Sequence, residues 1–182
     1  IETLLSGDQR AEGHPYYDLA HAEQSPDHTL FAITEDCQGA ERYTLTLFQA
    51  GTEIVVDHPL QDLRGDFEWS ADSQALIYTR LDDHQRPSSV WCHRLGTPQS
   101  DDHCVLTLDD PGRFIGLGKT SSEQFLTLEI HDHQTTQTFL LPADLSRLTP
   151  WPVTEWIEGL EYDLEDTGDA LLIKANWGHK DF

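Results

Sequence analysis

Histidine and cysteine residues, whose side chains can ligate metal ions, gather at two places in the sequence. One is His131-Asp132-His133, and the other is the pair of dipeptides Cys92-His93 and His103-Cys104, which flank an expected hairpin. A zinc site needs three or four converging ligands. For His131-Asp132-His133 we favour an exposed hairpin loop over a metal site. For the cysteines, buried free thiols are favoured over a Cys2His2 site or a disulfide. We therefore predict no bound metal.

A glycine-rich stretch that ends in Lys119 and Thr120 superficially resembles a phosphate-binding loop. Its glycines at 112 and 118 are one residue too far apart for the Gly-x-x-x-x-Gly-Lys-[Ser/Thr] pattern. Such a loop also follows a parallel strand and opens a helix, whereas this stretch coincides with an expected β-strand. We predict that it binds no phosphate and that the chain needs no cofactor.

The charge balance of the chain is strongly acidic. Eleven basic residues against 33 acidic residues give a net charge of −22. Such a surface repels phosphate backbones and anionic lipids, so we expect neither nucleic acid nor a membrane as a partner. It attracts cationic ligands, although solubility or a salty habitat explains the acidity equally well. The three cysteines are an odd number without framework spacing, which indicates a reducing compartment, and we expect the cytoplasm.

A polar turn followed by an apolar run recurs through the chain. The third turn positions are Asp27, Asp72, Ser122 and Gly168, spaced by 45, 50 and 46 residues. Short Asp and Ser side chains favour turns because they bond to nearby backbone N–H groups. The strands expected around each turn are rich in β-branched and aromatic residues. The apolar runs after the turns are Leu30–Ile33, Ala75–Tyr78, Phe125–Leu128 and Ala170–Ile173.

This repeat predicts an all-β fold. Runs such as Leu30–Ile33 are apolar on both faces, so a sheet must cover them on each side. Four-stranded sheets of about 45 residues stacked face to face describe the blades of a β-propeller. A two-sheet sandwich is the main alternative, but it gives no reason for a turn at blade spacing. The expected segments are a lead-in at 1–19, blades at 20–57, 65–108 and 112–149, and the start of a fourth blade at 159–182.

The repeat also predicts an outer strand for the first blade, a connector after the third blade and an incomplete ring. The outer strand of the first blade is expected at Glu53–Val56, and the stretch Leu148–Trp156 is expected to connect the third blade to the fourth. About three and a half antiparallel blades cannot close a ring, because propellers close with about four to eight. We therefore expect a piece of a longer protein, and self-association through its open blade faces. The absence of Met agrees with a piece, and a processed N-terminus is the alternative.

Several short stretches together resemble the propeller domain of the oligopeptidase B branch of the prolyl oligopeptidase family of serine peptidases. The resemblance rests on their order and spacing and spans nearly the whole chain. The stretches include Glu12-Gly13-His14, Ser25-Pro26-Asp27, Trp69-Ser70-Ala71-Asp72, Arg86-Pro87, His93-Arg94-Leu95-Gly96-Thr97, Lys119-Thr120-Ser121-Ser122 and Gly159-Leu160-Glu161-Tyr162-Asp163.

The resemblance implies a seven-bladed propeller that caps a C-terminal α/β-hydrolase domain. In that family the propeller admits short peptides, and a Ser-Asp-His triad in the hydrolase domain cleaves them after Arg or Lys. This chain has no Gly-x-Ser-x-Gly motif to set a nucleophilic serine on its strand-to-helix turn. We therefore assign no catalytic residue and expect the segment to be inactive alone, with short basic peptides and the hydrolase domain as partners. A protein-interaction propeller without peptidase activity is the alternative.

The resemblance also implies a role for one loop of the first blade. Glu35, Asp36 and Arg42 lie in and beside the loop between its second and third expected strands. Loops of this kind can approach the catalytic domain and form inter-domain ion pairs when the domains close. These three residues are therefore the predicted gating site. The alternative is a solvated surface pair, which contributes little to stability.

Overall fold

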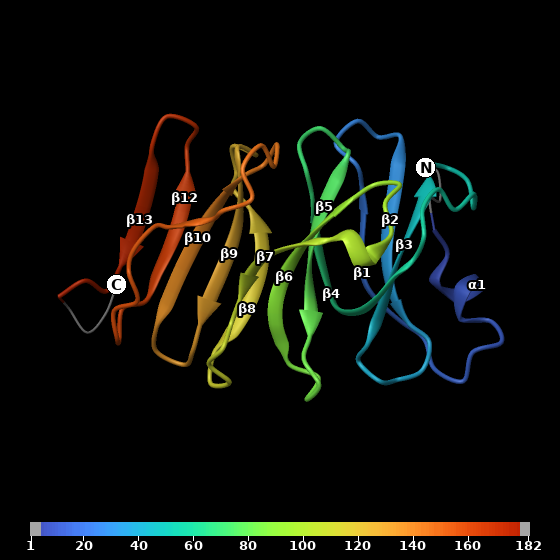
Figure 1. Cartoon of the computed structure of the whole chain (residues 1–182), viewed down its shortest axis with the longest axis horizontal. Coiled ribbons are helices and arrows are strands. Elements are labelled where there is room, and N and C mark those ends of the chain that lie inside the picture. The colour runs from blue at the N-terminus through green and yellow to red at the C-terminus, as the bar shows by residue number, and fades with distance from the viewer. Residues whose placement is uncertain (1–4, 179–182) are drawn as a thin grey trace.

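The computed structural model describes residues 5–178, and this part of the chain is built almost entirely from antiparallel strands (Figure 1). None of its helices is long and apolar enough to span a membrane. In chain order the elements are α1 (Gly7–Ala11), β1 (Asp18–Gln24), β2 (Leu30–Asp36), β3 (Tyr43–Gln49), β4 (Leu60–Trp69), β5 (Ala75–Leu81), β6 (Pro87–Arg94), a 3₁₀ turn (Gln99–Asp101), β7 (His103–Thr107), β8 (Phe114–Lys119), β9 (Phe125–His131), β10 (Thr136–Pro142), β11 (Trp151–Pro152), β12 (Tyr162–Asp166) and β13 (Leu171–Ala175).

The strands form three sheets whose neighbours follow chain order. The first sheet has the order β1-β2-β3-β4-β5-β6-β7, the second β11-β10-β9-β8, and the third β12-β13. Figure 1 shows the sheets standing side by side, from the first strands in blue at one end to β12 and β13 in red at the other. The prediction of an all-β partial propeller is confirmed. How the chain divides into individual blades remains an interpretation of these sheets.

Strand β4 belongs to two blades at once. Its first residues pair with β3, with Leu63 opposite Tyr43, and its last residues pair with β5, with Phe67 opposite Tyr78. The register shifts between Leu63 and Phe67, where the strand turns from the outer edge of the first blade to the inner edge of the second. We therefore interpret the seven-stranded sheet as two twisted blades joined by one strand.

Gly65 makes this change of direction sterically feasible. Its φ angle is +118°, a conformation that residues with a side chain rarely adopt. A Cβ atom at this position would lie 2.8 Å from the Cβ of Ala20 on β1. The Gly65 carbonyl accepts a hydrogen bond of 2.6 Å from the Thr34 hydroxyl, which holds the kink against β2.

Two apolar cores lie between successive blades, and β5 contributes to both. Leu76 and Tyr78 face the core shared with the first blade, whereas Ala75 and Ile77 face the core shared with the third. Successive side chains of a strand point to opposite faces, so a strand between two cores must be apolar throughout. This explains why the run has no alternating pattern.

The repeated turns join each blade to the next. The hydroxyl groups of Ser25 and Ser70 each accept a 3.0 Å hydrogen bond from the first backbone N–H of the strand that follows. The backbone N–H of Asp27 donates to the Ser73 hydroxyl in the next blade at 3.1 Å. The Ser122 hydroxyl likewise donates to Asp166, which ends β12. The turns that revealed the repeat therefore also supply polar contacts between its units.

Two details differ from the sequence prediction. The expected outer strand at Glu53–Val56 is reduced to one bridge between Phe48 and Val55, and the start of β4 takes the outer position beside β3. The expected connector Leu148–Trp156 contains β11, which pairs with β10. The apolar run 54–56 favours a strand in the sequence, but its side chains are exposed in the structure. Strand β11 has only two residues and therefore carries a weak signal.

We predict that Gly65→Ala lowers the free energy of unfolding by about 2 kcal/mol or more, because it adds a strained backbone and a contact with Ala20. Gly116→Ala is the matched control, since a Cβ there meets nothing within 4 Å. The control should change stability by less than about 1 kcal/mol. Urea unfolding measures both. Equal stability of the two variants would show that Gly65 does not determine the crossing.

Candidate functional site

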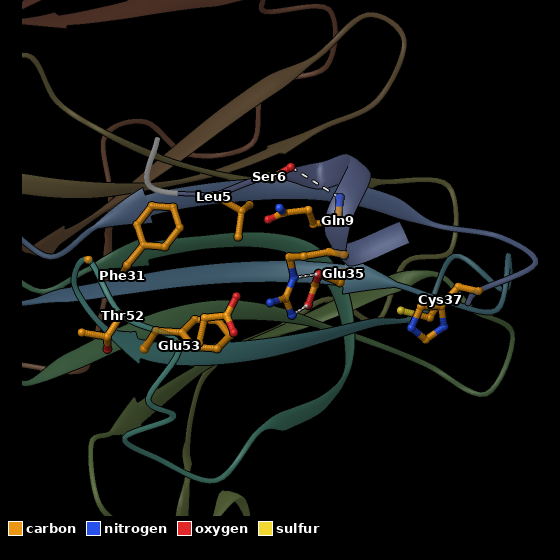
Figure 2. Close-up of a pocket in the computed structure, with 12 residues that line it drawn as sticks. Leu5, Ser6, Gln9, Phe31, Glu35, Cys37, Thr52 and Glu53 are labelled. Carbon is orange, nitrogen blue, oxygen red and sulfur yellow. Dashed lines mark hydrogen bonds and ion pairs between the residues drawn. The ribbon is translucent and has the colours of Figure 1, made fainter. Parts of the chain in front are cut away.

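Glu35, the first residue of the predicted gating site, is buried and holds the lead-in segment against the first blade. Arg10 on α1 donates from two guanidinium nitrogens to the two Glu35 carboxylate oxygens (Figure 2). The Tyr17 hydroxyl donates to the same carboxylate at 2.6 Å. The Arg10 guanidinium also lies 5.2 Å from the ring centroid of Phe48. These contacts fix the end of β2 before the loop begins.

The electrostatics of this cluster follow from its burial and its one carboxylate. The hydrogen bond to Glu35 raises the pKa of Arg10, and the guanidinium therefore stays charged. Burial, and then the hydrogen bond to Glu35, raise the pKa of Tyr17 to about 12, so its hydroxyl remains a donor at neutral pH. In this cluster the Arg10 guanidinium and the Tyr17 hydroxyl both donate to the one Glu35 carboxylate.

Asp36 shapes the loop itself. Its carboxylate accepts hydrogen bonds from the backbone N–H groups of Gln38 at 2.8 Å, Gly39 at 3.0 Å and Glu41 at 2.8 Å. Burial alone would raise its pKa, but these hydrogen bonds favour the ionised form and lower it. The charge of the Asp36 carboxylate is therefore stabilised by hydrogen bonds within its own loop.

Arg42 is the accessible member of the site. Its guanidinium lies 3.6 Å from the Asp62 carboxylate, and the two side chains are 43% and 54% exposed. An ion pair as open as this contributes about 0–1 kcal/mol to stability and exchanges partners readily. Glu35, Asp36 and Arg42 all line one hollow of about 380 Å³, but none of the three pairs with another. Their role in gating stays a prediction.

A larger hollow of about 790 Å³ lies between the lead-in segment and the first blade (Figure 2). The Arg10–Glu35 pair forms part of its wall, and the rings of Phe31 and Phe48 contribute apolar surface. The other residues that line it are Leu5, Ser6, Gln9, His14, Cys37, Gly51, Thr52 and Glu53. The two hollows share Glu35 and Cys37, and therefore lie on either side of the end of β2.

The stretch His131-Asp132-His133 lies at the hairpin between β9 and β10. The rings of His131 and His133 lie 5.5 Å and 6.3 Å from the ring of Phe114 on β8, so they form an aromatic group around it. Within residues 5–178, no three His, Cys, Asp or Glu side chains come together as metal ligands.

The two Cys-His dipeptides separate into different environments. Cys92 faces the apolar core between the second and third blades, and burial raises the pKa of its thiol to about 11. His93 faces the opposite way, with its two ring nitrogens 2.7 Å from Asp102 and 3.3 Å from Asp57. The thiol of Cys104 is free and lies on the strand beside β6. The four side chains therefore do not converge on one point.

The glycine-rich stretch forms β8 and passes through a turn into another strand. Lys119, at the end of β8, lies 3.5 Å from the Glu68 carboxylate on β4. The helix that a phosphate loop requires is replaced here by β9.

Sequence reasoning missed the partners of the site residues. Arg10 and Tyr17 lie 25 and 18 positions from Glu35, in a lead-in segment with no predicted structure. Asp57 and Asp102 lie 36 and 9 positions from His93. The Cys92-His93 pattern drew attention to His93 as one alternative metal ligand, but it gave no sign of the ion cluster that His93 forms with Asp57 and Asp102.

Two comparisons with known sequences match the chain over its whole length. The sequence profile of the prolyl oligopeptidase N-terminal beta-propeller domain matches residues 1–182. Protease 2 from Moraxella lacunata is 30% identical over 184 residues, covering 100% of this chain and 26% of that protein. Dipeptidyl aminopeptidase BI from Pseudoxanthomonas mexicana is 25% identical, covering 96% of this chain and 24% of that protein. The chain thus spans about a quarter of the length of these relatives.

Solved structures extend the likeness to three dimensions. Oligopeptidase B from Leishmania major superposes with a TM-score of 0.89 at 25% identity, covering 96% of this chain and 25% of that one. Oligopeptidase B from Trypanosoma brucei, in a closed form with covalently bound antipain, gives 0.86 at 26% identity and the same coverage. With the family profile matched from the first residue to the last, this chain belongs to the N-terminal β-propeller domains of the prolyl oligopeptidases.

Proposed function

We propose that this chain is the substrate-filtering propeller segment of a serine oligopeptidase that cleaves short peptides after Arg or Lys, and that the segment has no catalytic group of its own. The observation that carries the proposal is the likeness to two oligopeptidase B structures across 96% of the chain. The nucleophile would come from a C-terminal α/β-hydrolase domain of the parent protein, against which the propeller would act as a filter.

The distribution of charge supports basic peptides as substrates. The net charge of −22 attracts cationic ligands from solution. Strands β1, β4 and β8 lie side by side across successive blades, and they carry Glu23, Glu68 and Lys119. Burial raises the pKa of Glu68, and the charge of Lys119 partly offsets this. The inner strands thus present a mixed charge with an acidic excess, which would favour Arg and Lys side chains.

The free thiols support a reducing compartment for the parent protein. Cys37, Cys92 and Cys104 are all unpaired. We propose the cytoplasm, and fractionation of the cells that produce the parent would test this. Recovery in an oxidising compartment would contradict it.

Hydrolysis of a fluorogenic Arg-Arg peptide by this chain and by the full-length parent tests the proposed function. We expect activity in the parent and none in the chain, because the nucleophile would belong to the hydrolase domain. A parent that lacks hydrolase activity and a hydrolase sequence would favour the interaction-only propeller. Activity of the repurified chain would contradict the assignment of a non-catalytic segment.

We also propose that the loop carrying Glu35, Asp36 and Arg42 contributes to gating. Glu35 is committed to the lead-in segment through Arg10, and Asp36 is committed to backbone N–H groups of its own loop. Arg42 is therefore the member that can exchange its Asp62 partner for one on another domain.

In the full-length parent, Arg42→Ala should therefore change kcat/KM for peptides by about 2- to 10-fold, the effect of losing an interaction of ~0.4–1.4 kcal/mol. Stability of the propeller should be unaffected. Arg86→Ala is the matched control, because Arg86 pairs with Asp82 within a different hairpin at 2.9 Å. Unchanged kinetics and unchanged domain opening in Arg42→Ala would remove the gating role.

We further propose that the chain self-associates, and its uncovered apolar side chains support this. Within the described part of the chain, β13 is hydrogen-bonded to β12 on one edge. Leu172 on β13 is 55% exposed and Trp177 beyond it is 64% exposed. A two-stranded sheet with apolar faces is marginally stable by itself and tends to recruit further strands.

Light scattering over a range of concentrations tests this self-association. We expect a mass above that of one chain that rises with concentration, and Leu172→Lys should shift it towards the monomer. Gln134→Lys adds the same charge to an exposed hairpin and should leave the mass unchanged. A monomer at the highest soluble concentration would contradict the proposal.

A further inference from the structure

The side chain of His93 is completely buried between two carboxylates. Its Nδ1 atom lies 2.7 Å from Asp102 Oδ1, and its Nε2 atom lies 3.3 Å from Asp57 Oδ2. The exposed fraction of the side chains is 0% for His93, 0% for Asp102 and 3% for Asp57. Solvent therefore does not separate these three groups.

The three residues come from different parts of the first two blades. Asp57 lies in the connection between β3 and β4, His93 lies near the end of β6, and Asp102 lies just before β7. The Asp57 carboxylate also accepts a 2.7 Å hydrogen bond from the backbone N–H of Gly96. The Asp102 carboxylate accepts one of 2.6 Å from the hydroxyl of Tyr78 on β5. The cluster thus connects the outer edge of the first blade to three elements of the second.

The hydrogen-bonding capacity of imidazole decides which protonation state fits this arrangement. A neutral ring has one N–H donor and one lone pair, whereas an imidazolium has two donors. With a carboxylate facing each nitrogen, the neutral ring would direct its lone pair at one of them. The charged ring satisfies both, and one positive charge then lies between two negative ones.

The other titratable and charged groups nearby do not oppose this charge. Tyr78 reaches His93 only through Asp102, and burial together with that hydrogen bond raises the pKa of the Tyr78 phenol, so it stays neutral. On β6, the Cys92 thiol faces the apolar core and Arg94 is exposed. Burial lowers the pKa of His93, but the hydrogen bonds and charges of Asp102 and Asp57 outweigh it, and the pKa is raised.

We propose that Asp57, His93 and Asp102 form a pH-dependent clasp, in which an imidazolium fastens the connection between β3 and β4 to the second blade and releases it on deprotonation. This clasp does not depend on the proposed peptidase function. Its release would make the outer edge of the first blade more mobile as the pH rises.

The direction of the pH effect follows from linkage. A histidine in the unfolded chain has a pKa of about 6.5, and the folded value is higher. The stabilisation is therefore fully present below the unfolded pKa and is lost as the pH rises through the folded pKa. Other groups, such as His21 with its own raised pKa, contribute to the total in every variant and cancel in comparisons between variants.

Urea unfolding across the neutral and mildly alkaline range tests the clasp. The wild-type midpoint should fall with rising pH, and His93→Asn should lose this component. His103→Asn is the matched control, because His103 is exposed on the neighbouring β7 and should keep the wild-type profile. A His93→Asn variant that retains the full wild-type pH dependence would overturn the proposal.

Two measurements that retain His93 keep the test decisive if His93→Asn does not fold. NMR titration of the ring should give His93 a pKa above the ordinary histidine value, and Asp57→Asn should lower it. Hydrogen exchange of residues 54–58 should accelerate with pH by more than the intrinsic rise in the exchange rate. A ring that titrates at or below the ordinary value, or exchange that follows only the intrinsic rise, would overturn the clasp.

Discussion

Strand β4 is the connection on which the rest of this structure depends. A propeller chain must pass from the outer strand of one blade to the inner strand of the next, and here it does so within a single strand that bends at Gly65. After the bend, Phe67 and Trp69 lie in the core between the blades.

Polar contacts fix the relative rotation of the blades, which apolar stacking does not define. Apolar faces attract one another without a preferred direction, so they bring blades together but do not define their relative rotation. Directional contacts at three places complete the arrangement: the Ser and Asp side chains of the repeated turns, the Arg10–Glu35 pair beside the lead-in segment, and the His93 cluster at the outer rim. Each joins segments far apart in the sequence, and the proposed clasp is one of these junctions.

The fold was predictable from the sequence because its signal is local and repeated. Each turn at blade spacing is followed by a run such as Ala75–Tyr78, which is apolar on both faces because it lies between two cores. The candidate site was predictable only in part. The loop carrying Glu35, Asp36 and Arg42 lies between β2 and β3 as predicted, and its gating role stays a prediction. Arg10 and Asp57 reach their partners through tertiary contacts that no local pattern records. The outer strands were misplaced because the apolar run 54–56 is exposed in the structure and because β11 is only two residues long.

Native-state hydrogen exchange in low concentrations of denaturant tests most directly whether the shared strand joins the first two blades into one unit. Because β4 pairs with both β3 and β5, the best-protected amides of β2 and β5 should open with the same free energy and the same dependence on denaturant. If β2 opened at a distinctly lower free energy while β5 stayed protected, the blades would be independent units. The account of β4 as the common support of both would then be wrong.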